Sequence, residues 1–379
     1  MAQRTRAGRT SPPRSKSKSS RSERGLDEYA RKRDFERTPE PSGAAPSADG
    51  DERRFVIQQH DATRLHWDLR LEHEGVLLSW ALPRGLPWDP ERNHLAVHTE
   101  DHPLEYLTFE GHIPEGSYGA GMMTVWDTGT YEAEKIEDRK LVVVLDGERS
   151  RGRYALFQTD GRNWMIHRMD PPEDPTRRHP PERFSLLEAE PGPAPAGGGW
   201  ALETRWQGER CVLTSSGGVV DLVTAGGEAI DDHFPEVRPI GRALGATEVV
   251  LDGVVAAPDG GDAYLRRRLE ARSDSTRRRL ARDQPVAFVA FDLLWLDGHP
   301  LGERPWRERR ERLDELALEG PAWTTPSAYE GDPAPLVQAA AASGVETLVA
   351  KRIDAPYDPS LRPSPWRIFR VSDADREVE

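Results

Sequence analysis

The stretch 171–199 limits the possible folds of this chain most, because its composition does not support a long helix or strand. It is rich in Pro, Gly, Glu and Ala, with Pro171-Pro172-Glu173-Asp174-Pro175 at its start and Pro191-Gly192-Pro193 near its end. Proline fixes φ and lacks a backbone donor, so such a stretch is typical of a linker. The 379 residues are enough for two domains on either side of it, at 26–170 and 200–371.

The two ends of the chain are predicted to be tails. Residues 1–25 are rich in Arg, Lys and Ser with the single acid Glu23, although the whole chain carries a net charge of −13. A basic, low-complexity segment buries too little apolar surface to fold. We expect a disordered tail that contacts nucleic acid or another polyanion, or that only keeps the chain in solution. Residues 372–379 are expected to form a short second tail.

The composition argues against a secreted or membrane protein. No apolar run approaches the length of about 18 residues that a membrane span needs, and the N-terminus lacks the apolar core of a signal peptide. The single Cys211 excludes an internal disulfide framework and fits a reducing compartment. We therefore expect a cytoplasmic protein with no membrane partner.

The region 26–170 reads as short strands separated by turns. A short helical pattern at 26–37 is stopped by Thr38-Pro39-Glu40-Pro41. The predicted strands cover 55–59, 66–72, 76–82, 94–98, 122–127, 141–146, 153–158 and 163–168. Many short strands with few helical windows predict a mainly β domain, either a closed or partly closed β-barrel or a sandwich, with a short N-terminal helix.

The region 200–371 mixes both kinds of pattern. The predicted strands cover 200–206, 210–215, 219–224, 248–256, 286–295 and 347–351. The predicted helices cover 262–271, 304–317 and 333–343. This mixture is typical of an α+β domain.

The run from His60 to Arg70 carries the strongest chemical signal. His66, Asp68 and Arg70 alternate with apolar or aromatic residues, so they should share one face of a strand. A polar face of this kind is costly to bury without a metal or an anion, although a half-exposed strand facing water is the alternative. Imidazole nitrogen and carboxylate oxygen suit Mn, Zn or Fe, and so few ligands leave open positions for catalysis.

Arg70 and a second cluster add phosphate chemistry to this run. The guanidinium fork of Arg70 matches two phosphate oxygens, and a metal beside an arginine suits a phosphoryl transition state. The second cluster is Glu100-Asp101-His102-Pro103, with Tyr106 nearby. His102 is a candidate phosphate contact, a candidate acid for the leaving oxygen, or simply a turn histidine before proline.

Residues 26–170 closely resemble the 3′-phosphoesterase domain of bacterial ligase D. The matching motifs are Arg33-Asp34-Phe35, Thr38-Pro39-Glu40-Pro41, Phe55-Val56-Ile57-Gln58-Gln59-His60-Asp61-Ala62, Leu65-His66-Trp67-Asp68-Leu69-Arg70-Leu71-Glu72, Ser79-Trp80-Ala81-Leu82-Pro83-Arg84-Gly85 and Glu100-Asp101-His102-Pro103-Leu104-Glu105-Tyr106. This family is a manganese-dependent group of DNA-repair enzymes. It removes a 3′-terminal ribonucleoside and then the 3′-phosphate, which leaves a 3′-hydroxyl.

The resemblance implies a role for each matching residue. The implied metal ligands are His60, His66 and Asp68, with Mn²⁺ as the expected ion and Zn²⁺ or Co²⁺ also suited to the donors. The implied phosphate ligands or proton donors are Arg70, His102 and Tyr106. Arg33, Asp34 and Glu40 match residues that the family uses from its N-terminal arm, which should fold back over the site. Arg84 stands where the family usually has lysine, so the charge is kept and the geometry is not.

Residues 200–371 resemble, with less fidelity, the adenylyltransferase domain of ATP-dependent DNA ligases, an ATP-grasp-like nucleotidyltransferase fold. The family's first motif is Glu-x-Lys-x-Asp-Gly-x-Arg, in which the lysine takes AMP. Here it reads Glu203-Thr204-Arg205-Trp206-Gln207-Gly208-Glu209-Arg210. Arg205 stays protonated at any accessible pH and cannot act as the amine nucleophile.

Further losses follow along the same domain. Leu251-Asp252-Gly253-Val254 lacks the family's metal-side glutamate, and Trp366-Arg367-Ile368-Phe369-Arg370 lacks its two lysines. The degenerate nucleotide site would comprise Glu203, Arg205, Arg210 and Lys351. We expect no use of ATP and no OB-fold after residue 371, and we interpret the domain as a ligase-like pseudo-domain that binds DNA or a partner.

The sequence therefore predicts a DNA 3′-end-processing phosphoesterase of the non-homologous end joining type, cytoplasmic and associated with the bacterial nucleoid. Its expected partners are DNA 3′ ends, at primer–templates or breaks, and an end-joining polymerase, ligase or end-binding protein. Because most of the chain is acidic, basic residues at the site (Arg33, Arg70 and Arg84) and the N-terminal arm would carry the phosphate contacts. The alternatives are an active ATP-dependent DNA ligase and a non-catalytic scaffold that binds DNA ends.

Overall fold

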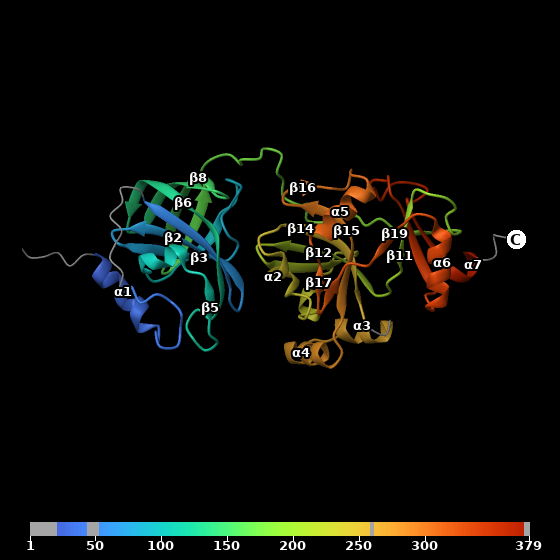
Figure 1. The fold of residues 1–379 in the computed structure, drawn as a ribbon, viewed down its shortest axis with the longest axis horizontal. Coiled ribbons are helices and arrows are strands. Elements are labelled where there is room, and N and C mark those ends of the chain that lie inside the picture. Colours follow the sequence, from blue (N-terminus) through green and yellow to red (C-terminus); the bar gives the residue numbers. More distant parts are fainter. Residues whose placement is uncertain (1–20, 44–52, 258–260, 375–379) are drawn as a thin grey trace, which may run out of the picture.

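The computed structural model describes residues 21–43, 53–257 and 261–374 (Figure 1). The first 20 residues of the predicted N-terminal tail and residues 375–379 lie outside these ranges. The tail prediction is wrong for residues 21–25, because helix α1 spans Arg21–Arg31. Arginine and glutamate favour helix at its start. The helix also ends before the predicted residue 37, because the chain turns inward where Arg33 reaches buried carboxylates.

The first domain is a closed antiparallel barrel of eight strands. They are β1 (Arg54–Asp61), β2 (Leu65–His73), β3 (Val76–Leu82), β4 (His94–His98), β6 (Gly121–Glu137), β7 (Lys140–Gly147), β8 (Arg151–Asp160) and β9 (Asn163–Arg168). Neighbours follow the order β1-β2-β3-β4-β9-β8-β7-β6, and β6 pairs back with β1, which closes the barrel. The predicted strands and the predicted mainly β fold are confirmed.

Two features of the barrel were not predicted. The strand β6 continues far beyond residue 127, because Tyr131, Ala133 and Ile136 keep facing the barrel interior. The short strand β5 (Gly111–Ile113) pairs with the start of β6 outside the closed ring. Three residues carry too little pattern to be recognised as a strand.

Strand alternation divides β2 between the inside and the outside of the barrel. Leu65, Trp67, Leu69 and Leu71 belong to the interior cluster. A separate outer cluster joins Tyr29 of α1 and Tyr106 of the 3₁₀ helix η1 (Leu104–Thr108) to outward-facing residues of β1 and β3. The arm with α1 therefore lies against the outer wall of the barrel (Figure 1). The polar residues of β2 point to this outer side, because they alternate with its interior residues.

The second domain is α+β, as predicted, and is built on two sheets. One sheet has the order β13 (Val219–Thr224), β12 (Glu209–Ser216), β14 (Val249–Ala256), β15 (Ala287–Leu296), β18 (Trp323–Thr324) and β17 (Glu319–Gly320), with β16 (His299–Pro300) paired to β15. The other has the order β10 (Glu190–Pro191), β21 (Trp366–Arg370), β20 (Thr347–Arg352), β11 (Trp200–Thr204) and β19 (Ala328–Glu330). The helices are α2 (Ile240–Leu244), α3 (Asp262–Leu269), α4 (Asp274–Asp283), α5 (Trp306–Glu315), α6 (Pro333–Ala342) and α7 (Val371–Ala374), with the 3₁₀ helix η2 (Asp231–His233).

The predicted linker 171–199 is only partly a free connection. Strand β10 pairs in parallel with β21, and Leu187 is buried with its backbone N–H bonded to the Tyr357 hydroxyl at 2.9 Å. Apolar side chains within a proline-rich stretch can still be buried against a neighbouring sheet. The second half of this segment therefore packs as part of the second domain. The predicted C-terminal tail likewise begins inside α7.

The two domains touch at the turn between β1 and β2. The guanidinium of Arg242 in α2 donates to the carbonyls of Ala62 at 2.9 Å and Thr63 at 2.8 Å, and it lies 3.2 Å from the Asp61 carboxylate. This contact holds the hairpin whose strands carry His60 and His66.

No helix in the three described ranges is long and apolar enough to cross a membrane.

Candidate active site

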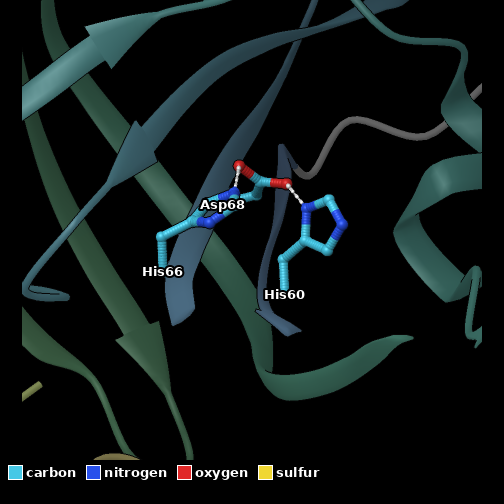
Figure 2. Close-up of side chains that lie close together, drawn as sticks. All are labelled: His60, His66 and Asp68. Carbon is cyan, nitrogen blue, oxygen red and sulfur yellow. Dashed lines mark ion pairs between the residues drawn. The ribbon is translucent and has the colours of Figure 1, made fainter. Parts of the chain in front are cut away.

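His60, His66 and Asp68 form a compact cluster on the outer face of the barrel (Figure 2). His60 in β1 pairs in register with His66 in β2, and Asp68 lies two residues further along β2. One ligand atom from each residue lies within 4.8 Å of the others. Asp68 faces both rings, with Oδ2 3.6 Å from His60 Nδ1 and Oδ1 3.7 Å from His66 Nε2.

Backbone carbonyls orient both imidazole rings. His60 Nε2 lies 2.9 Å from the Gly119 carbonyl, and His66 Nδ1 lies 2.9 Å from the Arg64 carbonyl. A carbonyl only accepts, so each of these nitrogens carries the proton. The other nitrogen of each ring, Nδ1 of His60 and Nε2 of His66, faces Asp68, which is the arrangement typical of histidine metal ligands. The donors fit Mn²⁺, Zn²⁺ or Co²⁺.

Asp68 is the anionic member of the cluster. It is only 6% exposed, and burial alone would raise its pKa. Arg70 Nη2 donates to Oδ2 at 2.9 Å, and this charge together with the two rings lowers the pKa of Asp68 well below its usual range. The carboxylate is therefore ionised at neutral pH and available to a cation.

Arg70 is held rigidly beside the cluster with part of its donor capacity unused. It is 2% exposed, and besides Asp68 it donates from Nε to Gln58 at 2.7 Å and from Nη1 to Ser79 at 3.1 Å. The face of the Tyr106 ring lies 4.7 Å from the guanidinium carbon. A guanidinium has five N–H donors, so one N–H on each Nη stays available to two oxygens of a phosphate.

His102 lies next to Arg70 as a neutral side chain. Its Nδ1 donates to the Glu100 carbonyl at 2.8 Å, and its Nε2 accepts from Arg33 Nη2 at 3.1 Å. Burial, together with the charges of Arg70 and Arg33, holds the pKa of His102 well below its ordinary value. In this state His102 is an acceptor and not an acid.

Tyr106 is brought next to His102 and Arg70, but its hydroxyl has another partner. The hydroxyl donates to the buried carboxylate of Glu40, and burial raises the pKa of Tyr106 well above its ordinary value. The ring contacts both His102, at 4.7 Å between centroids, and Arg70. Its contribution here is therefore to pack against these two side chains.

Arg33 fastens the N-terminal arm to the barrel beside His102. Its Nε donates to Glu40 at 2.6 Å and its Nη1 to Glu100 at 2.8 Å, and its side chain is 4% exposed. The neighbouring Asp34 is exposed instead, with its carboxylate accepting from the Glu36 backbone at 3.2 Å. The structure thus brings Arg33 and Glu40 to His102 and Tyr106 and places Asp34 on the surface of the arm.

Arg84 is not brought to the cluster of His60, His66 and Asp68. It is exposed in the turn after β3 and lines a cavity at the barrel mouth together with Trp67 and Gly85. Trp67 belongs to the interior of the barrel, whereas the cluster lies on the outer face. The expectation of a phosphate-site role at Arg84, taken from its place in a motif, has no support in this position.

The docking of the arm should depend on pH through Glu100. Burial raises the pKa of Glu100, but hydrogen bonds from Arg33 and Lys32 outweigh it and leave the pKa below the ordinary value of 4.5. A lowered pKa means that this stabilisation is full above about pH 4.5 and is lost as the pH falls through the folded-state pKa. We expect the amides of α1 to exchange faster at pH 4 than at pH 7 after correction for intrinsic rates, while those of β14 keep their protection. Equal protection of α1 at both pH values would contradict this.

Sequence reasoning missed the residues that support this site. Gln58 and Ser79 orient Arg70, the carbonyl of Gly119 orients His60, and Glu100 anchors the arm. The period of two in β1 places Gln58 on the same face as His60, so that signal was available. The contact from Gly119 spans 59 residues of sequence and had no local signal.

The second domain has a cavity of about 530 Å³ that brings together the four residues of the predicted nucleotide site. Glu203, Arg205, Arg210 and Lys351 all line it. Lys351 Nζ lies 2.9 Å from Glu203 and donates to the Phe291 carbonyl at 2.8 Å. Arg205 is exposed.

Arg210, like Lys351, is a basic residue of this cavity that is already bonded to acceptors of the protein. It donates to both carboxylate oxygens of Asp252, at 2.7 and 2.6 Å, and to the Leu187 carbonyl at 3.2 Å. The charged groups of Lys351 and Arg210 are therefore both hydrogen-bonded to acceptors of the protein.

Family models assign both domains. Residues 58–158 match the DNA Ligase D 3′-phosphoesterase domain, and residues 194–367 match the ATP dependent DNA ligase domain. Each of the two domains is therefore similar to the family that its model describes. Two ligase D relatives are named multifunctional non-homologous end joining proteins. The one from Mycobacterium tuberculosis (strain H37Rv) is 39% identical over 90% of this chain and 44% of its own length. The one from Pseudomonas aeruginosa is 34% identical over 91% of this chain and 47% of its own length.

The chain thus spans less than half the length of these ligase D relatives. Among solved structures, a mycobacterial DNA ligase D complexed with ATP and MES covers 50% of this chain and 60% of its own, at 30% identity and a TM-score of 0.41. The predicted resemblance of both domains is confirmed by the family matches.

Proposed function

We propose that the barrel domain is a metal-dependent DNA 3′-end phosphoesterase that removes 3′-phosphate and 3′-ribonucleoside groups, with Mn²⁺ as its metal. The observation that carries this proposal is the cluster of His60, His66 and Asp68, whose free ring nitrogens and ionised carboxylate face one point. The match of residues 58–158 to the ligase D phosphoesterase family supports it.

Each group at the site has a task in this proposal. His60, His66 and Asp68 hold the metal, which when bound supplies positive charge to a phosphate ester. The two unused N–H groups of Arg70 bind two phosphate oxygens and orient the ester bond. Arg33, which donates to His102 Nε2, adds positive charge beside Arg70.

Phosphate release from a primer–template with a 3′-phosphate tests the proposal. We expect release that requires Mn²⁺ and is lost in a His66→Ala variant, because the variant lacks one of three metal ligands. His167→Ala, which removes a histidine on the opposite part of the barrel wall in β9, should keep wild-type activity. A folded, manganese-loaded protein that releases no phosphate would overturn the proposal.

We further propose that the second domain does not adenylate itself. Arg205 occupies the position of the lysine nucleophile, and the amine of Lys351 is engaged by Glu203 and a backbone carbonyl. The match of residues 194–367 to ATP dependent DNA ligases makes an active ligase the second candidate. Incubation with labelled ATP separates them: we expect no covalent AMP, and AMP on Lys351 would establish the ligase.

The biological role that we propose is taken from the names of the relatives. Their names place them in non-homologous end joining, and we propose the same role for this chain, in the cytoplasm at the bacterial nucleoid. Its partners would be DNA 3′ ends and an end-joining polymerase, ligase or end-binding protein. A non-catalytic scaffold would instead bind 3′ ends with no turnover, which the phosphate-release assay distinguishes.

A further inference from the structure

A second cavity, of about 360 Å³, lies where the mouth of the barrel faces the second domain. Trp67 and Arg149 line it from the barrel, Arg177 from the connecting segment and Glu248 from the second domain. Trp67 stands between His66 and Asp68 in β2, and successive side chains of a strand point to opposite faces. The cavity and the metal cluster are therefore on the two sides of one strand.

The charge of this cavity favours an anion. The arginines that line it are Arg84, Arg149, Arg151, Arg168 and Arg177. The lining carboxylates are three. Glu173 lies 3.6 Å from Arg168 and Glu248 lies 3.6 Å from Arg177. Asp174 accepts from the Thr176 backbone N–H at 2.8 Å and from its hydroxyl at 2.6 Å.

Two of these arginines have no carboxylate partner among the described residues. Arg84 and Arg149 are exposed, and within the described residues neither forms an ion pair with a carboxylate, whereas Arg151 lies 3.4 Å from Asp146. Guanidinium groups without a carboxylate partner are suited to phosphate oxygens. The unmatched positive charge thus lies at the barrel side of the cavity.

Aromatic rings are interleaved with these cations. The Trp88 ring stands 4.5 Å from the His179 ring at an interplanar angle of 34°, and the Arg177 guanidinium lies 4.4 Å from the Trp88 centroid. Arg149 lies 5.5 Å from the centroid of Trp126. Arginines that follow a phosphate backbone, together with rings that stack on bases, are what single-stranded nucleic acid requires. A volume above about 300 Å³ accommodates a small ligand such as one nucleotide.

The contact between the domains fixes this cavity relative to the metal. Arg242 binds the turn between β1 and β2, which leads directly into the strand that has the cavity on one side and the cluster on the other. At the same junction Gly217 lies against Arg84, where an added Cβ would stand 3.0 Å from the Arg84 Cα. We propose that the cavity binds unpaired nucleotides of the DNA whose 3′ end occupies the metal site. This deepens the proposed function and rests on it.

Binding of labelled DNA to the whole chain in EDTA tests this without any turnover. The probes are a fluorescein-labelled primer–template with a single-stranded thymidine overhang and a blunt duplex of the same sequence, followed by fluorescence anisotropy between 50 and 200 mM salt. The test variant is Arg84→Gln with Arg149→Gln. The charge-matched control is Arg278→Gln with Arg282→Gln, two exposed arginines of α4.

We expect the test variant to bind the overhang DNA about 10-fold more weakly. The slope of log K against log salt concentration should fall in magnitude by about 1.4, because each single-strand phosphate contact contributes about 0.7 to that slope and two contacts are lost. The blunt duplex and the control variant should show no such change. Trp88→Ala should weaken overhang binding with an unchanged salt slope, since stacking involves no counterion release.

Wild-type affinity and slope in the Arg84→Gln, Arg149→Gln variant would overturn the proposal. Equal weakening by the α4 pair, or equal weakening for the blunt duplex, would also overturn it, because either means general charge attraction. Failure of the phosphoesterase itself is visible separately, as a lack of manganese-dependent phosphate release, and leaves the binding result readable.

Discussion

Asp68→Asn should lower manganese-dependent phosphate release by about 10³-fold or more. Asparagine keeps the size of the side chain, but it removes the one carboxylate of a cluster whose other members are two imidazole rings. Arg70, at 2.9 Å, would then face the metal with no anion between the two positive charges. The measurement is kcat/KM on a 3′-phosphate primer–template across a manganese titration.

The control for this variant is Asp138→Asn, an exposed aspartate in the turn between β6 and β7. It should keep wild-type kcat/KM. Activity of Asp68→Asn within 10-fold of wild type at saturating Mn²⁺ would mean that the carboxylate is not a metal ligand, because a second-sphere group costs about 10–100-fold.

Arg33→Ala should release the N-terminal arm from the barrel. The side chain is 4% exposed and is the shared partner of Glu40 and Glu100, each with a side chain only 1% exposed. Removing one partner of a buried ion pair costs about 3–5 kcal/mol, because the remaining charges stay buried without compensation. We expect the free energy of opening of α1, measured by hydrogen exchange, to fall by about that amount, and phosphate release to fall with it.

Arg37→Ala is the matched control, since Arg37 is exposed on the same arm. It should leave both measurements unchanged. Arg33→Lys keeps the charge, but an ammonium has no fork with which to reach Glu40, Glu100 and His102 together. We therefore expect its α1 protection and its phosphate release to lie between those of Arg33→Ala and Arg37→Ala. Protection of α1 that survives Arg33→Ala would show that the apolar contacts of Tyr29 suffice to dock the arm.

The face of β2 was predictable because it depends only on the period of a strand. Alternation places His66, Asp68 and Arg70 together whatever the rest of the chain does. Which side of the closed barrel this face would take was not predictable from β2 alone, because both sides of the wall are covered by apolar residues. The outer side was decided by α1 and η1, which arrive from distant parts of the sequence.

The position of Arg84 in a motif did not predict where its side chain lies. It follows β3 in the turn Pro83-Arg84-Gly85, where no strand alternation assigns a side to each residue. Gly85, with φ of 66°, turns the chain there, and Arg84 faces the cavity at the barrel mouth. In the second domain, by contrast, Glu203 and Lys351 come together because β11 and β20 are neighbouring strands. Their pairing follows from the fold of the family.

The position of a bound metal tests the central claim most directly. An anomalous difference map at the manganese edge, from crystals of the active protein soaked in Mn²⁺, should show a peak that contacts His60 Nδ1, His66 Nε2 and a carboxylate oxygen of Asp68. The peak should vanish in crystals of Asp68→Asn. A manganese peak elsewhere in a protein that releases 3′-phosphate, with none at these three residues, would contradict this assignment of the active site.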